Sequence, residues 1–148
     1  MIYFLDASAL VKRYVSEPGT EDVRRLVRGR RRLAASSLSA LEVPSALARR
    51  VREGDLPREA AMQHARRVAT DLAEMHVVAV RSEVLSLAAD LVWRHPLRAY
   101  DAAQLASALR LAREGGLAMT FVCADGRLTV AARAEGLRAM LLGRSRGR

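Results

Sequence analysis

The chain has 148 residues, of which 51% are hydrophobic, and its formal net charge is +9, with arginine supplying all but one of the 25 basic side chains. This length suits one domain with a buried core, and no apolar run approaches the roughly 18 residues of a membrane span, which argues against a membrane protein. Because arginine binds phosphate with two hydrogen bonds and stacks on bases, the charge favours a nucleic-acid partner, although an arginine-rich solvated surface is the ordinary alternative.

Strands and helices alternate along the chain. Short runs rich in aliphatic, β-branched or aromatic residues predict strands at Ile2–Leu5, Leu33–Ser36, Val77–Val80, Thr120–Ala124 and Ala139–Leu142. Stretches with helical character, bounded by capping residues, glycine or proline, predict helices over residues 7–15, 21–29, 39–52, 57–75, 82–94, 99–114 and 126–135. The alternation predicts an α/β fold, namely a three-layer α/β/α domain with a mostly parallel central sheet over residues 1–142, followed by a short basic tail over residues 143–148.

Three positions bear on where the predicted helices begin. Thr20 and Ser82 are favoured N-cap residues and are expected to cap the helices that follow them. Pro44 lacks a backbone N–H, so the helix around it is expected either to begin close to Glu42 or to kink.

Four acids stand out from their apolar surroundings. Asp6 and Asp125 each follow an apolar strand directly, whereas Glu42 and Asp101 interrupt apolar helical stretches. Ligands of open α/β sheets bind at the carboxyl ends of the strands, and clustered carboxylates suit a hard divalent cation. Each acid also has an ordinary explanation: a helix cap for Asp6 and Asp125, a first-turn acid for Asp101, and a salt bridge to one of two nearby arginines, Arg49 or Arg50, for Glu42.

These acids sit in short motifs that occur in a fixed order. The motifs are Asp6-Ala7-Ser8, then Leu41-Glu42-Val43, then Tyr100-Asp101-Ala102 followed by Leu105-Ala106, then Ala124-Asp125-Gly126-Arg127-Leu128. Their order and approximate spacing resemble those of PIN-domain ribonucleases, and in particular the toxin half of bacterial VapBC toxin–antitoxin pairs. The resemblance covers about residues 1–142, and the ordered set is more specific than any single motif.

The resemblance implies a metal-dependent endoribonuclease that acts on RNA as the toxin of a type II toxin–antitoxin system. It implies an acidic pocket for Mg²⁺ or Mn²⁺ formed by Asp6, Glu42, Asp101 and Asp125, with Ser8 as the hydroxyl that accompanies the first acid. We expect Asp6 and Asp101 to bind the metal directly and Asp125 to bind it directly or through water. Glu42 is expected to hold a water or to act as general base.

The resemblance also implies partners for the protein. It implies a homodimer and a cognate small antitoxin that blocks the acidic pocket, for which an inserted Arg or Lys is the natural chemistry. Arg98 and Arg127 flank two of the acids and are candidates for binding RNA phosphate, with surface ion pairing as the alternative. Because Cys123 is the single cysteine and no basic stretch precedes the first strand, we expect no disulfide, no signal peptide and a cytoplasmic location.

Two positions depart from the pattern of the family. Many members carry Thr or Ser two residues before the last acid, where this chain has Cys123, and a thiol is a poorer partner for a hard cation. Pro44 beside the second acidic motif is also unusual.

Other enzyme classes lack their motifs here. No G-x-G-x-x-G follows the first strand and no Walker motif occurs, which argues against dinucleotide and nucleotide binding. A phosphoaspartate phosphatase would need an acid where Ser8 stands, and a receiver domain would need one where Arg81 follows a strand. The alternatives left open are a PIN-type housekeeping nuclease and a non-catalytic basic α/β module that binds RNA or protein.

Overall fold

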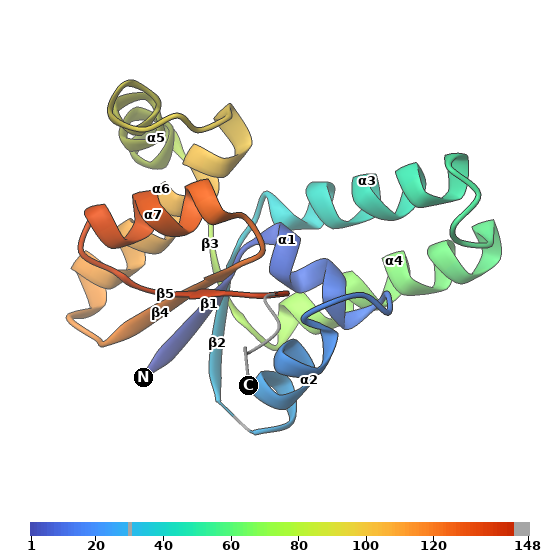
Figure 1. The fold of residues 1–148 in the computed structure, drawn as a ribbon. Helices are drawn as coiled ribbons and strands as arrows, with labels where there is room; N and C mark the ends of the chain where they lie inside the picture. Colours follow the sequence, from blue (N-terminus) through green and yellow to red (C-terminus); the bar gives the residue numbers. More distant parts are fainter. Residues whose placement is uncertain (30, 144–148) are drawn as a thin grey trace, which may run out of the picture.

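The computed structural model describes residues 1–29 and 31–143 and is built around one five-stranded sheet (Figure 1). The strands are β1 (Ile2–Leu5), β2 (Arg32–Ser36), β3 (His76–Val78), β4 (Met119–Cys123) and β5 (Arg138–Leu141). Their order is β3-β2-β1-β4-β5, and every neighbouring pair is parallel. The predicted α/β fold is confirmed, and the sheet is parallel throughout rather than mostly parallel.

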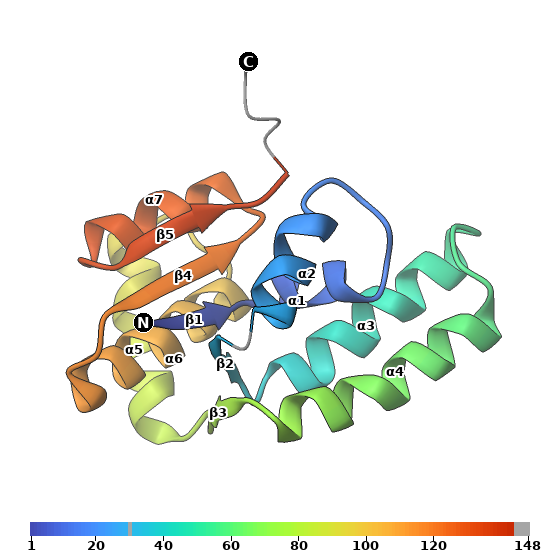
Figure 2. The same ribbon diagram turned by 90° about the horizontal axis from the view of Figure 1, so that it is seen from below.

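Helices cover both faces of the sheet, which gives the three predicted layers (Figure 2). One face is covered by α1 (Ala7–Leu10), a 3₁₀ turn η1 (Val11–Arg13), α2 (Thr20–Arg28), α3 (Ser39–Arg52) and α4 (Arg58–Ala73). The other face is covered by α5 (Ser82–Arg94), α6 (Ala99–Gly115) and α7 (Gly126–Ala134). Helices α3 and α4 pack side by side and extend beyond the edge of the sheet (Figures 1 and 2).

Strand β1 is the central strand of the sheet, between β2 and β4. Phe4 pairs with Phe121 across β1 and β4, and their rings stack with centroids 5.7 Å apart, fully buried from solvent. The chain leaves β1 toward β2 on one side and returns to β4 on the other side, so the strand order reverses between β1 and β4. Open α/β sheets bind ligands at such a point. The segment that begins with Asp6 leaves the sheet there, and the Asp6 N–H donates to the Val122 carbonyl at 3.1 Å.

The predicted helix starts are corrected at two positions. Gly19, with a φ of 94°, caps α2, and Thr20 is the first helical residue. Its hydroxyl instead closes the preceding loop, accepting from the Glu17 N–H at 3.0 Å and donating to the Val15 carbonyl at 2.9 Å. Ser82 likewise is the first residue of α5, which has no side-chain cap.

Two other details of the helices bear on the predictions. The helix expected over residues 7–15 is divided into α1 and the η1 turn. Helix α3 begins at Ser39, so Glu42 lies in its first turn and Pro44 lies inside the helix.

Within the described part of the chain, no helix combines the length and apolar character needed to cross a bilayer. The tail predicted over residues 143–148 lies outside the described residues except for Gly143.

Candidate active site

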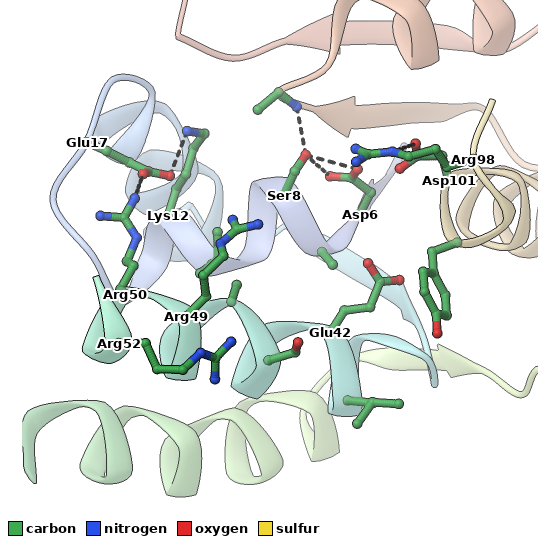
Figure 3. A pocket seen from close by; sticks show the side chains of 17 residues that line it. Asp6, Ser8, Lys12, Glu17, Glu42, Arg49, Arg50, Arg52, Arg98 and Asp101 are labelled. Carbon is green, nitrogen blue, oxygen red and sulfur yellow. Dashed lines mark hydrogen bonds and ion pairs between the residues drawn. The ribbon is translucent and has the colours of Figure 1, made fainter. Parts of the chain in front are cut away.

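A cavity of about 600 Å³ opens beside the carboxyl end of β1 (Figure 3). Three of the four predicted acids line it: Asp6 after β1, Glu42 in the first turn of α3, and Asp101 in the first turn of α6. The predicted residues Ser8 and Arg98 also line it. Segments far apart in the sequence therefore bring these side chains to one place.

Asp6 is the most buried of the acids, with 3% of its surface exposed. One carboxylate oxygen, Oδ1, accepts hydrogen bonds from the Ala9 N–H at 2.8 Å and from the Ser8 hydroxyl at 2.7 Å. The Ser8 oxygen in turn accepts from the Ala124 N–H at 2.9 Å. Asp6 therefore caps α1, as the alternative explanation for this acid predicted. Ser8 links the Asp6 carboxylate through hydrogen bonds to Ala124, the residue after β4.

Glu42 and Asp101 are partly exposed to the cavity. The amide of Gln104 donates to Glu42 Oε1 from a distance of 3.1 Å. Glu42 does not form the salt bridge to Arg49 or Arg50 that was its alternative explanation. Arg49 lies 4.0 Å from Glu53, and Arg50 pairs with Glu17. Asp101 accepts from Arg98, with 3.4 Å between Nε and Oδ2.

The acids influence one another electrostatically. The pKa of Asp6 is raised to about 7, mainly by burial; the hydrogen bonds from Ser8 and Ala9 lower it, and the charges of Asp101 and Glu42 contribute to the rise. Burial also raises the pKa of Glu42, with a contribution from Asp101, while its hydrogen bond to Gln104 and the charge of Arg98 act in the opposite direction. Three carboxylates thus lie together at one end of the cavity, where Arg98 pairs with Asp101, and a bound cation would relieve their repulsion.

A family model described as the PIN domain matches residues 3–129. The chain belongs to the PIN-domain family. It is also 35% identical over 134 residues to "Ribonuclease VapC46" of Mycobacterium tuberculosis, a match that covers 90% of this chain and 92% of that protein. The resemblance in the sequence motifs is confirmed.

Two solved structures of similar fold agree with this membership. The crystal structure of PAE2754 from Pyrobaculum aerophilum has a TM-score of 0.62 and 25% identity, and the match covers 94% of this chain and 83% of that one. A toxin–antitoxin complex from Klebsiella pneumoniae has a TM-score of 0.59 and 13% identity, over 86% of this chain and 89% of that one. The second likeness, at this identity, concerns the fold.

The fourth predicted acid, Asp125, is not among the residues that line the cavity. Asp125 is the N-cap of α7, and its Oδ1 accepts from the Arg127 N–H at 2.7 Å and the Leu128 N–H at 3.2 Å. Neither Asp125 nor Arg127 lines the cavity, although the preceding residue, Ala124, does. A metal-binding role for Asp125 and phosphate binding by Arg127 therefore stay predictions.

Several lining or supporting residues were not predicted from the sequence. Gln104 is one turn beyond Asp101 on α6 and is 1% exposed. A polar residue inside the apolar stretch that follows an acidic motif is the signal that could have identified it. The cavity is also lined by a group of basic side chains and one acid: Lys12, Glu17, Arg49, Arg50 and Arg52.

The donor set fits a hard divalent cation. PIN-domain VapC ribonucleases generally use such a metal. Among residues 1–29 and 31–143, no three His, Cys, Asp or Glu side chains are close enough to hold an ion by themselves. Mg²⁺ needs no such cage, because it commonly binds one or two carboxylates and completes its shell with water and substrate phosphate. The excess negative charge around Asp6 and the all-oxygen donors suit that mode of binding.

Proposed function

We propose that this protein is a Mg²⁺- or Mn²⁺-dependent endoribonuclease that hydrolyses RNA phosphodiester bonds as the toxin of a type II toxin–antitoxin pair. The observation that carries the proposal is the convergence of Asp6, Glu42 and Asp101 on one cavity in a PIN-domain chain. We also propose that residues 1–142 act as a single nuclease domain.

The catalytic roles follow from the environment of each acid. A cation held by Asp6 and Asp101, with Asp125 reaching it through water, would neutralise phosphate charge and lower the pKa of a bound water. Ser8 holds the Asp6 carboxylate in place through its two links to Asp6 and β4. Glu42 has a raised pKa and faces the same cavity, so it is suited to accept a proton from the attacking water. Arg98, 85% exposed at the rim, is placed to contact a phosphate.

A cleavage assay tests the proposed activity. A mixture of end-labelled RNA oligonucleotides is incubated with the purified protein in Mg²⁺ or Mn²⁺, in EDTA, and alongside DNA of the same sequences. We expect internal cuts in RNA with metal and none in EDTA. A folded protein that cleaves no RNA in either metal would contradict the nuclease function and favour the non-catalytic binding module.

The toxin role predicts partners and a compartment. The antitoxin would bind across the helices near Glu42 and place an Arg or Lys among the acids, where it forms charge-assisted hydrogen bonds. The toxin would act in the cytoplasm, where RNA is accessible, as a homodimer. Co-purification with the product of an adjacent small gene should give a complex that contains toxin pairs and no longer cleaves RNA. Overexpression that is harmless to cells without such a partner would favour a housekeeping nuclease.

Gln104 provides a test of how Glu42 is positioned. The Gln104 amide donates to both Ser39 Oγ and Glu42 Oε1 at 3.1 Å. In Gln104→Met the Glu42 carboxylate loses a buried donor of similar size, and a hydrogen bond to a charged group contributes about 1.5–3 kcal/mol. We expect kcat to fall by roughly tenfold, with little change in KM, in a steady-state cleavage assay.

A matched control separates this effect from a loss of packing. Ser107 lies one turn further along α6, is fully buried, and donates to the Ala103 carbonyl at 2.8 Å without touching the acids. Ser107→Ala should keep the wild-type kcat. Equal losses of kcat in the two variants would show that Gln104 acts only through the stability of the helix.

A further inference from the structure

The cavity has two ends of opposite charge. In Figure 3, Asp6, Glu42 and Asp101 lie toward one end, Lys12, Glu17 and Arg50 toward the other, and Arg49 lies between the two groups. With Arg52, three cationic side chains line the second end against the single carboxylate of Glu17, and Arg49 adds a fourth cation next to them. The proposed nuclease chemistry uses the acidic end and leaves the basic end without a role.

Helix α3 connects the two ends. Glu42 and Arg49 are seven residues apart, which places them on nearly the same face of the helix and about 10 Å apart along its axis. The residues between them that line the cavity are the small side chains of Ser45 and Ala46. A ligand that occupies the acidic end can therefore extend along α3 to Arg49 without a bulky side chain of the helix in its path.

The charges at the basic end differ in how well they are neutralised. Glu17 accepts from Lys12 at 2.8 Å and also pairs with Arg50, so one carboxylate serves two cations. Lys12 is only 8% exposed, so the ion pairs of the Lys12–Glu17–Arg50 cluster hold its side chains in place at the basic end. Arg49 is different: its side chain is 66% exposed and lies 4.0 Å from Glu53, an exposed pair that contributes little. Arg49 is thus an accessible cation, between the acids and a fixed region of net positive charge.

We infer that Arg49, supported by the Lys12–Glu17–Arg50 cluster, binds a backbone phosphate of the RNA next to the one that is cut. The inference rests on the proposed function and names a second contact for the same substrate. A guanidinium matches the geometry of a phosphate, and a contact of this kind positions a strand without reading its sequence. The path along α3 sets the direction in which the strand leaves the acids.

Binding to a single-stranded RNA oligonucleotide in EDTA tests the inference without cleavage. In Arg49→Gln we expect the affinity to fall by roughly tenfold. The slope of log affinity against log salt should become shallower by about 0.7, the value for one phosphate contact on a single strand. Arg49→Lys should retain the slope. The control is Arg25→Gln on α2, outside the cavity, because Arg25 is similarly exposed at 71% and lies 3.7 Å from Asp22.

A scan of neutral methylphosphonate linkages then locates the contact. Replacing one particular phosphate should weaken binding to the wild-type protein, and the same replacement should have no further effect in Arg49→Gln. An unchanged salt slope in Arg49→Gln, or an equal loss in Arg25→Gln, would overturn the inference. So would a wild-type protein that does not bind the oligonucleotide, and the cleavage assay then decides separately whether the nuclease function stands.

Discussion

Asp101→Asn is expected to reduce RNA cleavage by at least about 100-fold, the order of effect seen when one preorganised charge-stabilising group is removed. Asp101 lies at the mouth of the cavity with its side chain 21% exposed, so the substitution alters charge with little change in packing. Losing this carboxylate removes a direct ligand of the proposed cation. RNA affinity measured in EDTA should not fall, because a negative charge has been taken away from the phosphate path.

Asp90→Asn is the control for Asp101→Asn. Asp90 is exposed on α5 and does not line the cavity. Its substitution changes the net charge by the same amount and should leave kcat unaltered. An Asp101→Asn protein that cleaves RNA as fast as the wild type would remove Asp101 from the mechanism.

Asp6→Asn is expected to stabilise the metal-free protein at neutral pH. Burial raises the pKa of Asp6 from 3.8 to about 7, so between these values the folded protein keeps a proton that the unfolded chain has lost. The effect of Asp6 on the free energy of unfolding is therefore most favourable below about pH 4, where Asp6 is protonated in both states. The free energy of unfolding then falls as pH rises, by up to about 4 kcal/mol at pH 7. Asparagine stays neutral, caps helices as well as aspartate, and can still accept from Ser8 and Ala9.

Urea unfolding in EDTA at several pH values measures this effect. The difference in unfolding free energy between Asp6→Asn and the wild type should be near zero at pH 4 and grow toward pH 7 in favour of the variant. Taking the difference between the two proteins cancels the groups that titrate in both. If the variant is less stable than the wild type at pH 7, the folded protein stabilises the charged Asp6 carboxylate without a bound cation, which would contradict this prediction.

The fold and the principal acids could be predicted because they depend on local patterns. Apolar runs ending in Asp6 and Asp125 marked the ends of β1 and β4, and parallel strands place such ends at one edge of the sheet. Glu42 and Asp101 were identifiable because a carboxylate inside an apolar helical stretch needs a compensating partner.

The rest of the cavity depends on how helices are rotated against each other. Nothing local indicates that α3 and α6 turn Glu42 and Gln104 toward one another, or that Arg49 and Lys12 reach the same cavity from separate elements. Asp125 shows the reverse case. Its position after β4 was predicted correctly. Its side chain, however, accepts hydrogen bonds from two N–H groups at the start of α7, and the sequence alone does not show whether it caps this helix or points into the cavity.

The central claim, that Asp6 and Asp101 hold one divalent cation beside Glu42, is tested most directly by the unfolding temperature at pH 7 as Mg²⁺ is added. A ligand that binds only the folded state stabilises it by mass action, so the wild-type unfolding temperature should rise by several degrees from its value in EDTA. Asp6→Asn should begin higher and respond little, and Asp101→Asn should also respond little. An unfolding temperature that is unchanged by Mg²⁺ in the wild type, or that rises equally in all three proteins, would contradict the assignment of this site.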